Sequence, residues 1–122
     1  MTQDIKVTAE AGLVRVTYRG AVEYGAMTEM LRNVGRIASE MQSKLLLFDF
    51  READFGNYYV DTIKHAEEGP ALGIDRAFRI AVLGSEGNPM LQYIENVAVN
   101  RGFQVRTFTG ESEALAWLRG TL

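Results

Sequence analysis

Two short segments near the start of the chain alternate between apolar and polar residues. The alternation covers residues 4–9 and residues 13–19, and Ala11 and Gly12 lie between them. A period of two is typical of a strand with one buried face, and a short connection containing glycine favours a β-hairpin. The sequence therefore predicts that the chain opens with two paired, antiparallel strands.

The apolar positions change to helical spacing after this hairpin. From Tyr24 onward they recur every three or four residues, which predicts a long helix packed on a sheet. The predicted buried stripe of this helix consists of Met27, Met30, Leu31, Val34, Ile37, Ala38 and Met41. The run KLLLFDF at residues 44–50 follows directly and is apolar on both faces until Asp49, which indicates a strand covered on both sides within a parallel sheet.

A second helix is predicted over residues 58–68, because Gly69 and Pro70 supply a stop signal directly after it. Tyr58 and Tyr59 are adjacent, so they cannot both lie on the buried face, and we expect one of them to reach solvent, a pocket or a partner chain. The residues expected to share the buried face are Tyr59, Ile63 and Ala66.

The last third of the chain repeats the pattern of strand and helix. Residues 78–83 predict a buried strand, and the small residues at 84–87 predict a tight loop. Asn88 is a good helix cap and Pro89 fits the first helical position, so a third helix is expected up to Arg101. Its expected buried stripe consists of Leu91, Ile94, Val97 and Ala98.

A last strand and a last helix are predicted at the end of the chain. Residues 103–108 alternate in polarity as a strand does, and Thr109 is placed to cap the helix that follows. The inward residues of that helix are expected to be Ala114, Leu115, Trp117 and Leu118. The predicted order is ββαβαβαβα over residues 1–122, which describes a single α/β domain with one mixed central β-sheet and about four helices.

Composition supports one folded domain and excludes several classes of partner. The chain has 122 residues, of which 47% are hydrophobic and 24% are charged. The longest apolar run, residues 45–48, is far too short for a membrane span, which needs roughly 20 residues. The net charge is −3 and the basic residues are scattered, so nucleic acid is not expected as a partner. The N-terminus lacks the features of a secretory signal, which favours a cytoplasmic location.

The chain contains little reactive chemistry. It has no cysteine, which excludes disulfides, thiolate catalysis and thiolate metal sites, and His65 is its one histidine. A general-base role for His65 would need Asp61 to orient the imidazole, and no nucleophile is evident nearby. We favour an exposed helical histidine beside a carboxylate. We therefore expect no catalytic residue, no metal site, no cofactor and no enzymatic activity.

Several segments together resemble the SpoIIAA-like branch of the STAS/SEC14 superfamily, small bacterial domains related to anti-sigma-factor antagonists. The resemblance covers nearly the whole chain and rests on GLVRVTYRG, KLLLFDF, FRIAVLG and the closing FQVRTFTGESEALAWL. It implies a STAS-like fold and an interaction with protein partners. These segments report core packing and turns, so they support the fold more strongly than any activity.

The resemblance also implies a switch that this sequence lacks. Anti-sigma-factor antagonists are controlled by phosphorylation of a serine near the start of the helix after the third strand. Here no serine or threonine lies between Ser43 and Thr62. A phosphate needs a hydroxyl group to carry it, so the resemblance holds for the fold without extending to the serine switch.

One candidate ligand site lies where parallel strands end. Ligands of open α/β sheets bind beyond the carboxyl ends of the strands, which brings Asp49, Arg51 and the loop from Ser85 to Asn88 to one rim. Arg51, Ser85 and the amides before the helix at Pro89 could hold a small anionic or polar ligand. The alternative, which we favour, is that Asp49 caps a loop and Arg51 pairs with Glu52 or Asp54.

A second candidate is an apolar pocket. Tyr58, Tyr59 and Phe55 with the methionines could line it, as in the lipid-binding relatives on the SEC14 side of the superfamily. Ordinary core packing explains Met27, Met30 and Met41 more simply, because they lie on the buried stripe of the first helix.

Two functional hypotheses follow. The first, which we prefer, is a non-enzymatic protein-interaction or ligand-sensing module that binds a protein partner or forms a homodimer through a sheet edge or the second helix. The second is a carrier of a small apolar or lipid-like ligand, held beneath the second helix and residues 70–76. The tentative ligand-binding residues are Asp49, Arg51, Tyr58, Ser85 and Asn88.

Overall fold

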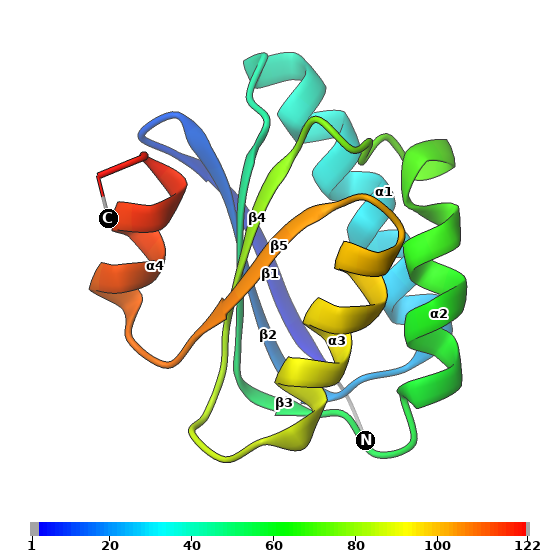
Figure 1. The fold of residues 1–122 in the computed structure, drawn as a ribbon. Helices are drawn as coiled ribbons and strands as arrows, with labels where there is room; N and C mark the ends of the chain where they lie inside the picture. The colour runs from blue at the N-terminus through cyan, green and yellow to red at the C-terminus, as the bar shows by residue number, and fades with distance from the viewer. Residues whose placement is uncertain (1–2, 122) are drawn as a thin grey trace.

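The computed structural model describes residues 3–121 and has an α/β architecture with a five-stranded central sheet (Figure 1). The strands are β1 (Asp4–Glu10), β2 (Leu13–Ala21), β3 (Leu45–Asp54), β4 (Arg79–Leu83) and β5 (Gln104–Phe108). The helices are α1 (Tyr24–Met41), α2 (Tyr59–Glu68), the short 3₁₀ helix η1 (Gly69–Leu72), α3 (Pro89–Asn100) and α4 (Glu111–Leu118). The predicted order ββαβαβαβα is confirmed, with η1 as an addition.

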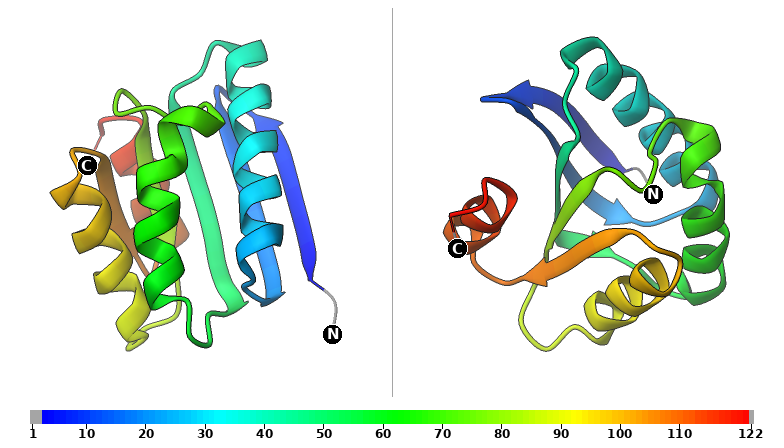
Figure 2. Two further views of the ribbon diagram at one scale, coloured as in Figure 1. Left: turned by 90° about the vertical axis from the view of Figure 1, so that its right-hand side faces the viewer. Right: turned by 45° about the horizontal axis from the view of Figure 1, so that its top comes forward.

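The strands lie side by side in the same order as they occur in the chain. β1 pairs antiparallel with β2, and β2, β3, β4 and β5 pair parallel in turn. Successive right-handed crossovers that always step in one direction put their helices on one face of the sheet. α1, α2 and α3 accordingly cover one face, whereas the terminal α4 covers the other (Figure 2). The predicted mixed sheet with an antiparallel hairpin is confirmed.

The sheet has a core on each face. The larger core lies under α1, α2 and α3, and the smaller one lies under α4. β3 contributes to both, because Leu46 and Leu47 point to opposite faces and are both fully buried. This confirms the prediction of a strand covered on both sides. The residues of the smaller core are Leu13, Leu47, Ala81, Leu83, Ala114 and Leu118.

A close backbone contact joins α1 to η1. A Cβ atom built at Gly35 would lie 2.2 Å from the backbone oxygen of Leu72, well inside ordinary van der Waals contact. Only glycine at this position of α1 allows the two segments to approach so closely. Gly73, which ends η1, has a positive φ of 96° and lies against the same glycine. The contact holds the segment between α2 and β4 against α1.

Three predictions about the bounds, caps and orientation of these elements are wrong. β3 continues to Asp54, four residues beyond the apolar run, because β2 extends beside it and supplies backbone partners up to Ala21. Thr109 does not cap α4, since the helix begins at Glu111 with Gly110 at the cap position and without a side-chain cap. Asn88 does cap α3 as predicted, because its side-chain oxygen accepts a hydrogen bond from the amide of Met90.

The third wrong prediction concerns the face that α2 buries. Tyr59 is 41% exposed, whereas Thr62 and His65 are buried. The helix is thus turned by about one residue from the predicted orientation. Polar side chains can occupy the buried face because each of them finds a hydrogen-bond partner inside the protein. The expectation that one of the two tyrosines reaches solvent is confirmed, since Tyr58 is buried and Tyr59 is not.

Candidate functional site

The first candidate region is the rim at the carboxyl ends of β3 and β4. Asp49 and Arg51 are two residues apart on β3, so their side chains point to the same face, the one that α4 covers. Arg51 donates from Nε and Nη2 to the two carboxylate oxygens of Asp49, at 3.0 and 2.8 Å. Such two-point pairing fixes the arginine in one orientation.

The ion pair is part of a larger cluster that reaches α4. Glu111, the first residue of α4, accepts hydrogen bonds from Arg15 at 2.8 Å and from Arg51 at 3.3 Å. A carboxylate is favoured in this first turn because the helix dipole is positive there. We call Arg15, Asp49, Arg51 and Glu111 the charge cluster. It joins α4 to β2 and β3.

The charge cluster shifts the pKa of both its carboxyl groups downward. Burial alone would raise the pKa of Asp49, but the hydrogen bonds from Arg51 outweigh it and hold that pKa below its usual value. The hydrogen bond from Arg15 lowers the pKa of Glu111. Both groups are therefore ionised at neutral pH and neither is suited to act as a general acid.

The other rim residues also have bonding partners within the protein. The Ser85 hydroxyl donates to the backbone oxygen of Arg51 at 3.0 Å, and Asn88 caps α3. The structure thus brings Asp49, Arg51 and Ser85 together as predicted. Tyr58 does not belong to this group, because it lies under α2 on the opposite face of the sheet.

The partner of Arg51 differs from the favoured prediction. Arg51 pairs with Asp49 and Glu111, and not with Glu52 or Asp54. The reason is that both alternative carboxylates have other partners: the register between β2 and β3 shifts at this point and Glu52 pairs with Arg19 of β2, whereas Asp54 accepts a hydrogen bond from the amide of Gly56. The strand order also never reverses, so the fold has no topological switch point that would single out this rim as a crevice.

The second candidate region lies on the buried face of α2. Tyr58, Thr62 and His65 follow one another at helical spacing and face the sheet. The Tyr58 hydroxyl is hydrogen-bonded to His65 Nδ1, and Thr28 Oγ1 lies 2.8 Å from His65 Nε2. The Tyr24 ring of α1 stacks on the imidazole with ring centroids 4.5 Å apart. These contacts tie α2 to α1.

The prediction of an exposed His65 is therefore wrong, since only 6% of the residue is exposed. Burial lowers the pKa of His65, although Glu68 and Asp61 oppose the shift. Burial likewise raises the pKa of the Tyr58 phenol. At neutral pH the pair is thus an uncharged imidazole beside an uncharged phenol. Nothing in the sequence pattern pointed to Thr28, which is the other hydrogen-bond partner of the imidazole.

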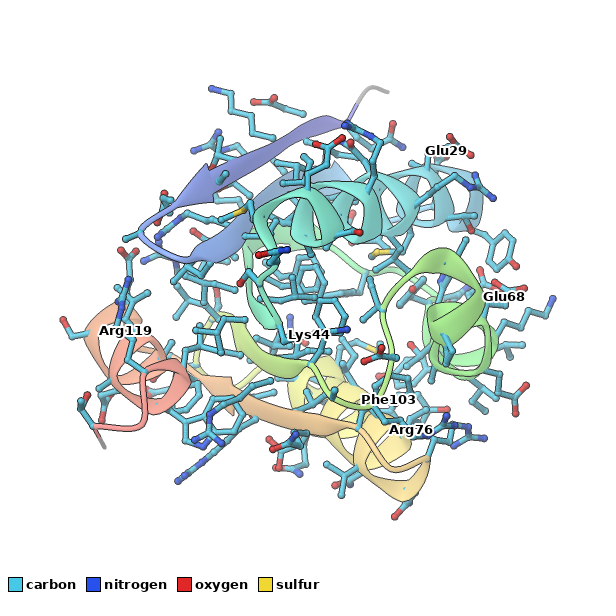
Figure 3. All side chains as sticks on the ribbon, turned by 90° about the horizontal axis from the view of Figure 1, so that it is seen from above. Glu29, Lys44, Glu68, Arg76, Phe103 and Arg119 are labelled. Carbon is cyan, nitrogen blue, oxygen red and sulfur yellow. The ribbon has the colours of Figure 1, made fainter. Side chains whose placement is uncertain are left out.

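An apolar cavity of about 120 Å³ lies next to this pair, between the sheet and the three helices. Apolar side chains of β3, β4 and β5 form its floor, and α1, α2 and α3 form its walls. Figure 3 shows Phe103 and Arg76 close to each other, and the Arg76 guanidinium lies 5.2 Å from the centre of the Phe103 ring. Phe103 is one of the cavity-lining residues, so Arg76 lies near that end of the cavity.

The polar side chains that line the cavity are Tyr58, Thr62 and His65. Each one is already engaged, because Thr62 Oγ1 donates to the backbone oxygen of Tyr58 at 2.9 Å and His65 bonds to Tyr58 and Thr28. Within residues 3–121, every buried side-chain nitrogen or oxygen atom has a hydrogen-bond partner. The cavity therefore presents a mostly apolar surface, and each of its polar side chains is already hydrogen-bonded within the protein.

Solved structures with a similar fold identify the architecture. An anti-sigma factor antagonist from Mycobacterium paratuberculosis superposes with a TM-score of 0.66 at 14% identity, over 97% of this chain and 95% of that one. The anti-sigma factor antagonist SpoIIAA in its unphosphorylated form gives 0.59 at 16% identity, over 96% and 99%. The chain has the SpoIIAA/STAS-like fold. The resemblance inferred from the sequence is thereby confirmed for the fold.

A third similar structure is also described as having a SpoIIAA-like fold. It is an uncharacterized DUF3478-family protein from Shewanella loihica PV-4, with a TM-score of 0.57 and 17% identity over 95% of this chain and 93% of that one. No protein-family model and no curated protein matches the chain. At these identities the SpoIIAA-like neighbours establish the architecture, and the function has to be argued from the residues of this chain.

Two further searches of the described residues bear on function. None of the helices within residues 3–121 is both long and apolar enough to cross a membrane. Across the same span, no three histidine or acidic side chains gather in a way that could hold a metal ion.

Proposed function

We propose that this protein is a non-enzymatic protein-interaction or ligand-sensing module of SpoIIAA-like fold that acts in the cytoplasm. The observation that carries the proposal is an exposed apolar surface at the start of α2. Val60 is 65% exposed and Tyr59 is 41% exposed. Neighbouring apolar side chains on a rigid helix are typical of surfaces that bind other proteins.

The packing of Tyr59 supports this interpretation. Its ring meets the Tyr93 ring of α3 edge to face at 4.9 Å, and the Tyr93 hydroxyl donates to the backbone oxygen of Tyr59 at 3.2 Å. An aromatic side chain held in place loses little conformational entropy when a partner binds. We call Tyr59, Val60 and Tyr93 the aromatic patch. The partner is another protein or a second copy of this chain.

The state of three titratable groups within residues 3–121 favours a binding role over acid-base catalysis. The one imidazole is buried against Tyr58 and Thr28, and the two carboxyl groups of the rim are held ionised by arginines. Acid-base catalysis needs a titrating group with access to a substrate, and these three groups do not provide it.

We also propose that the module works without a serine switch at α2. The residues that lead into the helix, from Gly56 to Tyr59, carry no aliphatic hydroxyl group. Thr62 is the first such residue, and it is buried with its hydroxyl donating to a backbone oxygen. A kinase could reach this hydroxyl only if the helix moved away from the sheet.

A pair of matched substitutions tests the interaction module. Val60→Asp places a charge in the aromatic patch, and Val99→Asp makes the same change at the opposite end of the helical layer, where Val99 is 48% exposed. Tagged parent and variant proteins would be compared by quantitative affinity purification and by analytical ultracentrifugation. We expect a partner or a homodimer that the parent and Val99→Asp retain and Val60→Asp loses. Equal behaviour of all three proteins would refute the proposal.

A second candidate function is the binding of a small apolar or lipid-like molecule. The cavity beside Tyr58 and His65 favours it, because it lies beneath α2 and is also lined by Gly69 and Ile74 from the segment before β4. Native mass spectrometry of freshly purified protein separates the two functions. A ligand-free dimer supports the interaction module, and a stoichiometric adduct lost on denaturation supports ligand binding.

Binding of a small anion at the rim is a further proposal. Arg51 carries the charge for it, and the side chain is 43% exposed. An incoming anion would have to compete with Asp49 and Glu111 for the same guanidinium. Titration with inorganic phosphate tests the idea, since Arg51→Ala and Ser85→Ala should both weaken binding. Unchanged affinity in both variants would remove the rim from consideration.

A further inference from the structure

We infer that the cavity under α2 binds one small, uncharged, apolar molecule about the size of a single six-membered ring, such as a simple aromatic compound. The inference rests on the proposed binding of a small apolar or lipid-like molecule. It narrows the class of ligand, because fatty acids and phospholipids are excluded. Three properties of the cavity support it: its size, the internal hydrogen bonding of its polar side chains, and the chemistry of its walls.

The volume sets the size of the ligand. The cavity measures about 120 Å³, whereas pockets for drug-sized molecules range from about 300 to about 1,000 Å³. An engineered apolar cavity of about 150 Å³ in another protein stays dry and binds benzene or xenon. A ring of six carbon atoms with at most a methyl group is thus the size that fits. A long acyl chain would not fit without a large movement of the helices.

The polar groups of the walls set the charge of the ligand. Tyr58, Thr62 and His65 already form hydrogen bonds within the protein, so none of them is left as a buried polar group that needs a partner from the ligand. A buried water molecule needs about two to four polar partners, so water is poorly held here. A carboxylate or phosphate would lose its hydration and find no counter-ion, because no lysine or arginine lines the cavity.

The walls are suited to an aromatic ring. Phe48 and Phe50 stack with their ring centroids 5.4 Å apart on the floor of the cavity, and Phe103 lies at one end. Aromatic rings attract one another in offset and edge-to-face arrangements. Met27 adds a flexible thioether that can adapt to the outline of a ligand.

The cavity is partly open to solvent, and separation of α2 from α1 would widen it. The two helices are joined by Thr28 with His65 and by the Tyr24 hydroxyl, which donates to Glu68 at 2.6 Å. These bonds involve few groups, so local opening of α2 costs less than global unfolding. A bound ligand would resist this opening, and amide exchange in α2 should slow when the cavity is filled.

Toluene provides the direct test, with binding followed by two-dimensional NMR of the full chain. We expect saturable shifts of methyl groups around the cavity, and slower amide exchange in α2. Benzoate and decanoate serve as charged and long-chain probes and should not bind. Ala98→Leu fills the cavity from α3 and should weaken toluene binding by at least about tenfold. Ala66→Leu does the same from α2 if the first variant fails to fold.

The matched control is Ala116→Leu, which adds the same side chain on α4 at the opposite face of the sheet and should leave toluene binding unchanged. Toluene binding that Ala98→Leu and Ala66→Leu leave unaltered would overturn the inference. Binding of decanoate but not toluene would also overturn it, while the proposed ligand-binding function would survive. If none of the probes binds, both fail.

Discussion

The close contact between Gly35 and η1 allows a specific prediction about the free energy of unfolding. Replacing a helical glycine with alanine normally stabilises a protein by up to about 1 kcal/mol, because alanine has the higher helix propensity. Gly25 in the first turn of α1 should follow this rule, since a Cβ atom there meets nothing within 4 Å. Gly35→Ala in the same helix should do the opposite.

The size of the effect follows from the distances. The new Cβ atom would lie 2.2 Å from the Leu72 oxygen, whereas ordinary contact begins at 3.4 Å, so the two backbones must separate by about 1.2 Å. Overpacking of a rigid interior costs about 1–3 kcal/mol, and two facing backbones place this site at the upper end. After subtraction of the gain in helix propensity, Gly35→Ala should destabilise the protein by about 2 kcal/mol.

Urea unfolding followed by circular dichroism measures both variants. A loss of about 2 kcal/mol corresponds to a fall in Tm of about 8 °C for a chain of this length. Gly25→Ala should raise the unfolding midpoint or leave it unchanged. If Gly35→Ala proved as stable as the parent, the close packing of η1 on α1 would be refuted, and with it one wall of the region that encloses the cavity.

Three further predictions concern the polar groups. The pKa of His65 is lower in the folded protein than in the unfolded chain, so the unfolded state binds the proton more readily. The free energy of unfolding should therefore fall as the pH drops through about 6.5. In urea titrations between about pH 7.5 and pH 5.5, His65→Gln should weaken this pH dependence. Glu111→Gln removes the negative charge that pairs with Arg15 and Arg51. It should lower the free energy of unfolding by only about 0.5–1 kcal/mol, because the Glu111 side chain is 39% exposed. An equal loss of stability in about 1 M salt would contradict an ionic origin. Asn88→Ala should cost about 1 kcal/mol through loss of the helix cap and Asn88→Gly only a few tenths, so equal losses in thermal unfolding would argue against capping.

Local patterns predicted the order of elements and most of their bounds. The stripe from Met27 to Met41 identified α1, and Asn88 with Pro89 marked the start of α3 correctly. These signals work because the residues that produce them are neighbours in the chain, and the spacing of apolar side chains is set by the geometry of a single helix or strand.

The orientation of α2 could not be obtained in this way. By apolar pattern alone Tyr59, Ile63 and Ala66 form its inner face. In the structure Thr62 and His65 are buried, Ile63 and Ala66 are half-buried, and Tyr59 is exposed. The hydrogen bond between His65 and Thr28 spans 37 residues of sequence, and only such a distant partner makes burial of the imidazole acceptable. The spacing of apolar residues within the α2 segment contains no information about that distant partner.

The candidate sites were likewise predictable only where they depend on residues that are close in the sequence. The rim was predictable in part, because Asp49 and Arg51 lie at the end of the apolar run of β3, but the pairing of Arg51 with Glu111 depends on where α4 lies. The sequence by itself determined the elements, their order and the lack of cysteine and of further histidines, since each of these is local or compositional. Only the tertiary structure decided which face of α2 is buried, where α4 packs and that a cavity remains, because these features depend on how side chains from distant segments fill shared space.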